Sequence, residues 1–443
     1  MEYVSIGQVK PNPANPRTHS KTQLKKLQRS MKRFGFVAPM IVDAAGVLLA
    51  GHARLEVARM IGLDKVPVIR ASDLTPAEAK AYLIADNQLV LLGDWDSEAL
   101  GALMLELSLP SLNIDLEDTG FEMSQIDLLI DAIGKAPQPS GKEDELPVPR
   151  TPVTVLGDAW LTENGHIIVC GDSTRDESFA AFGGKKADMA CIDPPYNVRI
   201  PGHVSGNGKV KHQDFAMASG EMSRSEYIDF LVAAFRQLAA HTRAGAIIDV
   251  FEDWRHLSEL YTAGERALFV LLTLAVWVKE NAGMGSMYRS QHELCAVFRN
   301  GRAPHRNNVQ LGKFGRYRTN VWKYPSAKTF SRSGDEGNIL AMHPTPKSVA
   351  LIQDAILDCT ARGDIVLDSF LGSGTLLISA ERSGRICHGV ELEPGFVDVA
   401  VRRWQAYTGG QARHAVTGKT FDEMAKERAK PTSKGIRKGG RHG

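Results

Sequence analysis

Cysteine is scarce in this sequence, and the few that occur are not spaced to cross-link the chain or to bind zinc. The 443 residues include 5 cysteines, an odd number, and no two of them stand in CxxC spacing. Small secreted scaffolds carry an even, closely spaced set, and structural zinc sites bring thiols together in short pairs. The sequence therefore predicts a protein of a reducing cytoplasm, without a disulfide framework and without a metal site.

Long apolar runs are also missing. The longest, residues 267–278, spans 12 residues and includes Thr273. At about 1.5 Å per residue it would reach roughly 18 Å as a helix, which is short of the ~30 Å hydrocarbon core of a bilayer. The first residues, 1–13, show neither the basic region nor the apolar stretch of a secretion signal. We expect no membrane span, no membrane partner and a cytoplasmic location.

Charge of one sign dominates three segments, although the formal net charge of the whole chain is only +2. Residues 1–70 hold 12 Lys or Arg against 4 Asp or Glu, whereas residues 71–134 hold 1 against 13. Residues 294–334, called the basic segment below, hold 9 basic residues, no acidic residue and interleaved aromatic residues such as Tyr317. This composition can neutralise phosphates and stack on bases, so it favours nucleic acid as a partner. A solvated charged face is the alternative.

Prolines mark a boundary between two parts of the chain. Residues 135–152 contain 5 prolines, mixed charge and no periodic apolar pattern, which is typical of an extended linker. The first part, 1–134, predicts short strands and helices of an α+β domain. The last residues, 419–443, are basic and glycine-rich and are predicted to form a flexible tail.

The second part alternates between apolar strand patterns and helical patterns. We expect strands at residues 166–170, 189–192, 246–251, 274–278, 294–298, 365–367 and 387–390, and helices at 225–241, 253–263, 346–359 and 375–383. Such alternation predicts an α/β fold, a doubly wound and mostly parallel sheet covered on both faces, with the ligand crevice at the carboxyl ends of its strands.

The first chemical motif, Asp193-Pro194-Pro195-Tyr196, directly follows the expected strand 189–192. A rigid turn would explain the prolines, but not an acid and an aromatic ring at a sheet edge. The exocyclic amine of a base is a poor nucleophile, because its lone pair is delocalised into the ring. The Asp193 carboxylate and the Pro194 carbonyl can accept the hydrogens of this amine. Pro195 stiffens the pair, and Tyr196 offers a face to an extruded base. These four residues are the predicted catalytic set.

The second motif, residues 368–375 with the sequence DSFLGSGT, joins an expected strand to an expected helix. Its glycines allow close approach of a ligand, and the helix start presents free N–H groups. Glu391 follows Gly374 by 17 residues, at the end of the next strand, where an acid can bind both ribose hydroxyls. A dinucleotide site is the competing interpretation, but GSG differs from GxGxxG and the Lys-Ser/Thr pair of a P-loop is missing.

Together the motifs resemble the amino-methyltransferases of DNA, in the permuted order of the β group of that family, where the DPPY box precedes the glycine loop. Further matches lie at residues 277–279, 288–293, 343–347 and 389–394. The resemblance covers about residues 153–407. It implies a Rossmann-like domain, here 153–418, that binds S-adenosylmethionine and methylates an amine of double-stranded DNA. It places this cofactor against Asp172, Lys347, Asp368, Phe370, Gly372, Ser373, Gly374, Thr375 and Glu391.

The resemblance also places the target-recognition segment at about residues 299–340. The predicted DNA contacts are Arg302, Arg306, Lys313, Arg316 and Arg318. Adenine N6 is the expected acceptor, because Asp in the first position of the box is more typical of adenine enzymes than of cytosine-N4 enzymes. Cytosine N4 stays the alternative, as does methylation of RNA or of a protein amide. The pairing with a restriction nuclease is left open.

The first part resembles the ParB/sulfiredoxin-like domain. Residues 12–17 (NPANPR) match its entry motif, residues 51–54 (GHAR) stand at its nucleotide-phosphate box, and residues 86–88 match as well. His52 and Ala53 depart from the Gly-Glu-Arg-Arg pattern of that box, so a nucleotide at this domain stays open, as does a homodimer. The other class of function is a ParB-like DNA-binding regulator with an inactive methyltransferase domain. The intact Asp193, Gly372, Gly374 and Glu391 argue against it.

Overall fold

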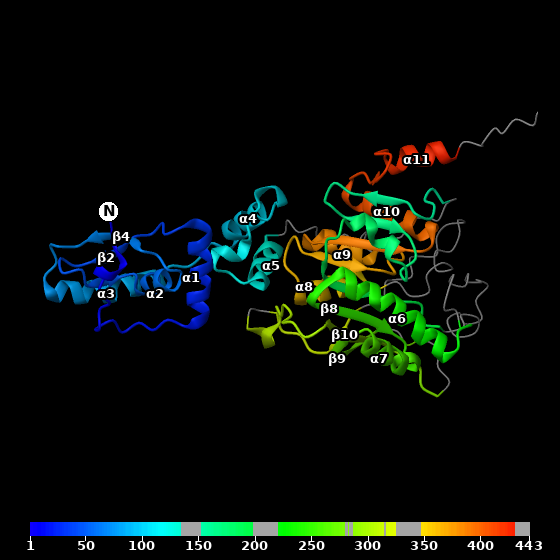
Figure 1. The fold of residues 1–443 in the computed structure, drawn as a ribbon, viewed down its shortest axis with the longest axis horizontal. Coiled ribbons are helices and arrows are strands. Elements are labelled where there is room, and N and C mark those ends of the chain that lie inside the picture. Colours follow the sequence, from blue (N-terminus) through cyan, green and yellow to red (C-terminus); the bar gives the residue numbers. More distant parts are fainter. Residues whose placement is uncertain are drawn as a thin grey trace, which may run out of the picture. The chain divides into compact units, whose positions relative to one another are not determined.

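The computed structural model describes residues 1–133, 152–197, 220–279, 282, 287–313, 316–324 and 347–429. Contacts divide the chain into two units, Met1–Lys135 and Ala136–Gly443 (Figure 1). The predicted linker, 135–152, lies outside the described residues apart from Pro152. Within the described residues, no helix combines the length and the hydropathy that crossing a membrane requires.

Unit 1 contains a four-stranded sheet in the order β1-β4-β2-β3. Its strands are β1 (Glu2–Ser5), β2 (Met40–Val42), β3 (Leu48–Ala50) and β4 (Lys65–Arg70), and its helices are α1 (Lys21–Phe34), α2 (His52–Met60), α3 (Pro76–Leu89), α4 (Ser97–Leu107) and α5 (Met123–Ala132). α3 begins at a capping box. The Thr75 hydroxyl accepts the N–H of Glu78, while the Glu78 carboxylate accepts the N–H of Thr75, so the two residues cap the helix reciprocally.

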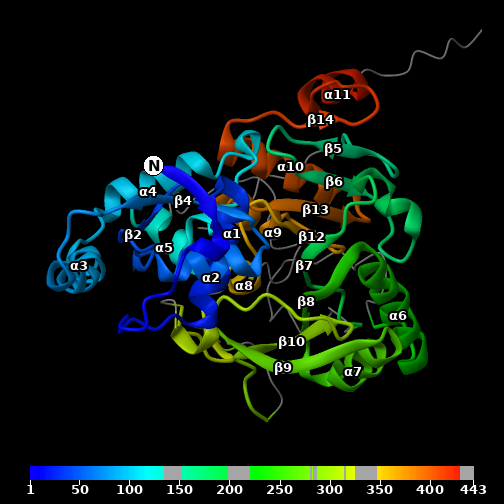
Figure 2. The same cartoon turned by 60° about the vertical axis from the view of Figure 1, so that its left-hand side comes forward.

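Unit 2 is built on a ten-stranded sheet in the order β11-β9-β10-β8-β7-β12-β13-β6-β5-β14. In Figure 2 this sheet runs from β9 at the bottom to β14 at the top. The strands are β5 (Ala159–Leu161), β6 (Ile167–Cys170), β7 (Ala187–Ile192), β8 (Thr242–Glu252), β9 (Phe269–Val278), β10 (His292–Asn300), β11 (Val321–Lys323), β12 (Ile365–Asp368), β13 (Ile386–Glu391) and β14 (Arg413–His414). The predicted α/β fold is confirmed.

The centre of this sheet is parallel, whereas both of its sides contain antiparallel pairs. β8, β7, β12, β13 and β6 pair in parallel, whereas β10 is antiparallel to both β8 and β9. From β7 the chain first builds the β8 side and then returns to β12 on the other side of β7. The strand order therefore reverses between β7 and β12. In such sheets the ligand crevice lies at the carboxyl ends of the strands at this switch point.

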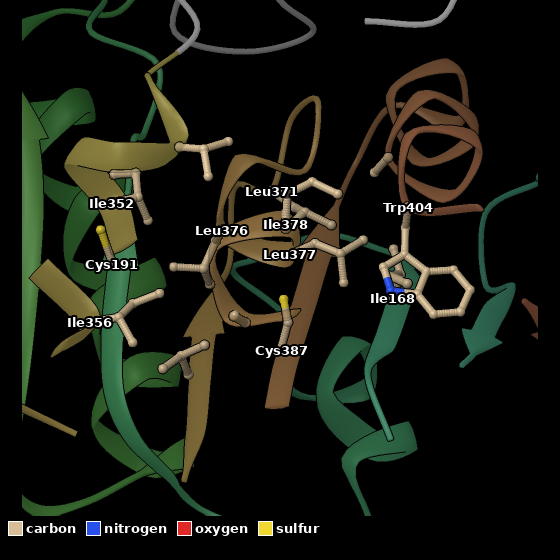
Figure 3. Close-up of a cluster of buried hydrophobic side chains, with 14 of the residues drawn as sticks. Ile168, Cys191, Ile352, Ile356, Leu371, Leu376, Leu377, Ile378, Cys387 and Trp404 are labelled. Carbon is tan, nitrogen blue, oxygen red and sulfur yellow. The ribbon is translucent and has the colours of Figure 1, made fainter. Parts of the chain in front are cut away.

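Helices cover both faces of the sheet (Figure 2). α6 (Arg224–His241) and α7 (Leu257–Arg266) pack on one face, and α8 (Val349–Cys359), α9 (Thr375–Ser383) and α10 (Pro394–Thr408) on the other. Each face has its own hydrophobic core. Figure 3 shows the core under α8, α9 and α10, in which Ile352, Ile356 and Leu376 pack together with Cys191 of β7 and Cys387 of β13. All five cysteines are buried as free thiols. These two cores hold the strand ends at the switch point in register.

The C-terminal segment differs from its prediction. Residues 419–443 were expected to form a flexible tail, but α11 (Phe421–Arg428) belongs to the folded unit. The Phe421 ring is fully buried and lies 4.9 Å from the Trp160 ring, and Arg428 donates to the Asp158 carboxylate. The prediction rested on the basic composition of this segment and did not take account of Phe421, the aromatic residue that anchors it. Residues 430–443 lie outside the described part of the chain.

Candidate active site

A cavity opens at the switch point between β7 and β12. Its empty volume, counting the part open to solvent, is about 410 Å³. Apolar side chains line it together with carboxylates, an ammonium group and hydroxyls. The lining includes Cys191, Ile192, Asp193, Phe251, Lys347, Ile352, Asp368, Phe370, Leu371, Ser373, Thr375 and Leu376. Small-molecule sites have this mixture of apolar walls with a few polar groups.

Asp193 stands where β7 ends, at the mouth of this cavity. One carboxylate oxygen, Oδ2, accepts a hydrogen bond from Lys347 Nζ at 2.6 Å, and the other, Oδ1, accepts one from the Tyr196 hydroxyl. The carboxylate is thus held from both sides by its own chain. Behind it, the Pro195 carbonyl accepts a hydrogen bond from the Tyr227 hydroxyl at 3.1 Å. We call Asp193–Tyr196 the acid–proline corner.

Lys347 lines the same cavity as Asp193, Ser373 and Thr375, and its contact with the cofactor stays a prediction. The Lys347 carbonyl accepts a hydrogen bond from the Thr375 hydroxyl at 3.3 Å, while its side chain reaches the corner. Its Nζ lies 2.6 Å from Asp193 Oδ2, 2.9 Å from Glu293 Oε2 and 3.2 Å from the Tyr196 hydroxyl. Burial alone would lower the pKa of Lys347, but the two carboxylates outweigh it and raise the pKa above its ordinary value. Lys347 is therefore a buried, permanently charged group.

Glu293 and Lys279 complete the cluster and were missing from the predicted site. Glu293 is the second residue of β10, and its carboxylate forms ion pairs with both Lys279 and Lys347. Burial would raise the pKa of Glu293, but these two ammonium groups hold it below its usual range. Two cations thus face two carboxylates, so the buried cluster is neutral as a whole. Glu293 lies 100 residues from Asp193 in the chain, so no local spacing could associate them.

The glycine turn, Asp368–Thr375, connects β12 to α9. Gly372 and Gly374 have φ angles of +53° and +80°, which side chains rarely adopt. A Cβ on Gly374 would also lie 2.8 Å from the Ala400 Cβ of α10, so this position packs directly on a neighbouring helix. The buried Arg403, which sequence analysis did not identify, donates to the Ser373 carbonyl at 3.1 Å. The turn is held rigidly beside the cavity.

Two further predicted cofactor residues lie at the same edge of the sheet. Glu391 ends β13, and its carboxylate accepts the N–H groups of Gly372 at 2.8 Å and Glu393 at 2.9 Å. Burial raises the pKa of Glu391. Asp172 follows β6 and accepts the N–H of Thr174 at 2.9 Å. Neither side chain is among the cavity-lining residues named above, so the structure brings them to the edge but not into the cavity.

The first residues of the basic segment after β10 lie at the edge of the sheet opposite the corner, and their contact with DNA stays a prediction. β10 runs from the corner, at Glu293, to Asn300, about 23 Å away at roughly 3.3 Å per residue. Asn300 contacts Thr242 at the amino end of β8, and Asn308 donates to the Leu357 and Thr360 carbonyls at the far end of α8. Arg302, Arg306 and Lys313 lie on this stretch, far from Asp193.

Arg316 and Arg318 are engaged with carboxylates of α8 rather than presented to a phosphate. Arg316 lies 2.7 Å from Asp358, and Arg318 lies 3.0 Å from Asp354 and 2.8 Å from Asp358. Both guanidinium side chains are nearly buried, at 10% and 13% exposure. These ion pairs give both guanidinium groups a structural role, and their contact with DNA stays a prediction. Residues 325–340 of the expected target-recognition segment lie outside the described residues.

The fold and site together define a Rossmann-like enzyme domain with an acid–proline corner and a glycine turn at its switch point. Residues 187–402 match the family model described as DNA methylase. Residues 1–87 match the ParB N-terminal domain and residues 98–156 the ParB-methyltransferase HTH domain. The chain therefore contains a domain of the N6/N4 DNA methylase family, whose cofactor is S-adenosylmethionine, and a ParB N-terminal domain. Sequence analysis did not separate the HTH domain.

Individual relatives match the two parts separately. The ParB-like nuclease domain-containing protein YnaK of Escherichia coli (strain K12) is 41% identical over 73 residues, 16% of this chain and 84% of the relative. Type II methyltransferase M2.DpnII of Streptococcus pneumoniae is 26% identical over 255 residues, 56% of this chain and 92% of the relative. The crystal structure of the M1.HpyAVI–SAM complex is 23% identical, covers 54% of this chain and 98% of its own, and has a TM-score of 0.39.

Proposed function

We propose that this protein transfers the methyl group of S-adenosylmethionine to the exocyclic N6 of adenine in double-stranded DNA. The observation that supports this most strongly is the meeting of Asp193 with the glycine turn across one cavity. The corner offers hydrogen-bond acceptors to an amine, and the turn offers a rigid, closely approachable backbone beside it. The domain of the N6/N4 DNA methylase family supports methyl transfer to DNA.

In this proposal the cofactor supplies an electrophilic sulfonium methyl group. Asp193 and the Pro194 carbonyl accept the two amine hydrogens, which favours a pyramidal nitrogen whose lone pair points at the methyl carbon. The nitrogen–carbon bond forms as the carbon–sulfur bond breaks, and the electron pair stays on sulfur. Asp193 is the nearest carboxylate to accept the proton that the methylated amine then loses. Tyr196 offers its ring to the extruded base once the base displaces its hydroxyl from Asp193.

The cofactor is held by the remaining predicted residues. We assign the backbone of Gly372, Ser373, Gly374 and Thr375, with Asp368 and Phe370, to the part of the cavity next to the corner. Glu391 is assigned to the ribose hydroxyls and Asp172 to the adenosine ring. The carboxylate of Glu391 holds the Gly372 N–H, so it links ribose recognition to the shape of the turn.

The preference for adenine rests on Asp193 as the first residue of the box, and cytosine N4 is the second candidate. Both bases present an exocyclic amine to the same corner, so the cavity volume does not separate them. Incubation of the protein with labelled S-adenosylmethionine and duplex DNA, followed by mass spectrometry of the nucleosides, distinguishes N6-methyladenine from N4-methylcytosine. Label in RNA or protein instead of DNA would overturn the proposal.

The Asp193→Ala variant tests the role of the corner. It removes the acceptor for the amine while leaving the glycine turn in place, so we expect methyl transfer to fall by at least about 1,000-fold. Cofactor affinity, measured by isothermal titration calorimetry, should stay within about threefold of wild type. Asp229→Ala, on the exposed surface of α6, is the matched control and should keep full activity. Substantial transfer by Asp193→Ala would remove the mechanism.

A further inference from the structure

We propose that the turn Asp253–His256 is a DNA-contacting surface, on which the Trp254 indole stacks against a base next to the one held at Asp193. This inference rests on the proposed function, because it assigns part of the DNA contact of the same site. It would supply a DNA contact close to Asp193. The basic residues from which the sequence predicted DNA binding lie at the far edge of the sheet or pair with α8.

The turn lies at the same edge of the sheet as the corner. It follows β8, the strand that pairs in parallel with β7, and Asp193 follows β7. A short chain of contacts joins the two. The His256 ring packs edge-on against the Tyr227 ring at 5.2 Å, and the Tyr227 hydroxyl donates to the Pro195 carbonyl. Tyr227 also bonds Glu252, the last residue of β8, at 2.8 Å. A base extruded into the corner therefore leaves its neighbour close to this turn.

The side chains of Trp254, Arg255 and Asp253 form a flat surface on which a base can stack. Trp254 is 56% exposed, so packing within the protein does not account for its large ring. The Arg255 guanidinium lies over this ring, 5.1 Å from its centroid, and is held there by both oxygens of Asp253 at 2.9 and 3.0 Å. One side of the indole is thus supported by a cation. Indole and guanidinium planes are the groups on which unpaired bases stack, and such contacts tolerate any base.

Steady-state methylation of a duplex substrate tests the surface. We expect Trp254→Ala to raise the KM for DNA about tenfold, while kcat and the dissociation constant of the cofactor stay within about twofold. Trp254→Phe keeps a stacking ring and should remain within about threefold of wild type. Tyr317→Ala, at an exposed residue of the basic segment, tests the competing surface. Leu268→Ala is the matched control, because Leu268 is 79% exposed but directly precedes β9 at the edge of the sheet opposite Asp193. Its KM should not change.

The outcomes separate this inference from the proposed function. A wild-type KM for Trp254→Ala, or an equal rise in Trp254→Ala and Trp254→Phe, would overturn the stacking role. A rise in Tyr317→Ala without one in Trp254→Ala would return DNA binding to the basic segment. If the wild-type protein methylates no DNA, the proposed function fails. Fluorescence anisotropy with a labelled duplex then still tests the surface, with the same tenfold difference in affinity expected between Trp254→Ala and wild type.

Discussion

At the scale of single residues, the corner depends on how the charge of Lys347 is balanced. A buried ammonium group is costly unless carboxylates or aromatic faces replace the water it loses. Here Nζ faces Asp193 and Glu293, and it also lies 4.9 Å from the Phe251 centroid and 5.8 Å from the Trp277 centroid. Lys347 in turn fixes the position of one Asp193 oxygen. Glu293 therefore acts on the corner through Lys347.

The Glu293→Gln variant should reveal this indirect role in a pH profile. Glu293 is one of two carboxylates that raise the pKa of Lys347, so its neutral replacement lowers that pKa. Lys347 then loses its proton at a lower pH, so kcat of the variant should fall toward pH 10, where the wild-type protein keeps Lys347 charged. We also expect kcat at pH 7.5 to fall about tenfold with little change in the KM for DNA.

Methylation rates between pH 6 and 10 measure both effects. Glu265→Gln, at an exposed position of α7, is the control and should follow the wild-type profile. If Glu293→Gln lowered kcat equally at every pH, the carboxylate would have a packing role only.

At the scale of elements, the Glu381 carboxylate connects α9 to α10 directly and to β13 through His166. Glu381 of α9 accepts hydrogen bonds from His166 Nε2 at 2.8 Å and from the Trp404 indole of α10 at 2.9 Å. His166 Nδ1 accepts the N–H of Cys387 in β13, so the proton of the neutral ring sits on Nε2. Burial would raise the pKa of Glu381, but these donors, with Asn164, lower it to about 2.

Because the pKa of Glu381 is lower in the folded than in the unfolded state, the carboxylate stabilises the fold at pH values above its ordinary 4.5. This stabilisation is lost as the pH falls toward 2. Glu381→Gln should therefore reduce the free energy of unfolding by about 2–3 kcal/mol at pH 7 and by clearly less at pH 3. Urea unfolding at the two pH values measures the difference. An equal loss at both would show that shape, and not charge, matters at this position.

At the scale of the molecule, the uneven distribution of charge along the first 134 residues is resolved within unit 1. Arg29 of α1 pairs with Glu117 at 3.0 Å and Asp118 at 2.6 Å, and also with Asp115. Lys26, one turn earlier, pairs with Glu122 at 2.9 Å. The basic face of α1 thus docks on the acidic segment 115–122. These basic residues hold the two halves of the unit together, so the excess of positive charge in residues 1–70 is not by itself a nucleic-acid surface.

The Arg29→Ala variant should destabilise unit 1 by about 1–2 kcal/mol at low ionic strength, because it leaves three carboxylates near one another without their shared cation. Salt screens such partly exposed pairs, so the loss should shrink in about 1 M NaCl. Urea unfolding at the two salt concentrations measures it. Arg59→Ala, at an exposed position of α2 in the same unit, is the control. An effect of Arg29→Ala that did not depend on salt would contradict the electrostatic account.

Local patterns alone were enough for the central strands and the two motifs of this chain. The capping box at Thr75, the strand before Asp193 and the glycine turn before α9 follow from side-chain chemistry within a few residues, and the structure has all three. The same patterns predicted the α/β fold and a crevice at the carboxyl ends of the strands. β11, β5 and β14 were missed, because strands of two or three residues carry too few side chains for a periodic signal.

What only the tertiary structure decided is where distant charges meet. The reversed direction of β10 sends Arg302, Arg306 and Lys313 to the edge opposite Asp193, and strand direction leaves no mark in a local apolar pattern. Lys347 and Glu293 become partners of Asp193 only because β7, β10 and the start of α8 converge. The sequence by itself therefore determined the class of fold and the two motifs, since these depend on neighbours along the chain. The charge balance of the site and the DNA-facing side depend on packing between strands about 100 or more residues apart.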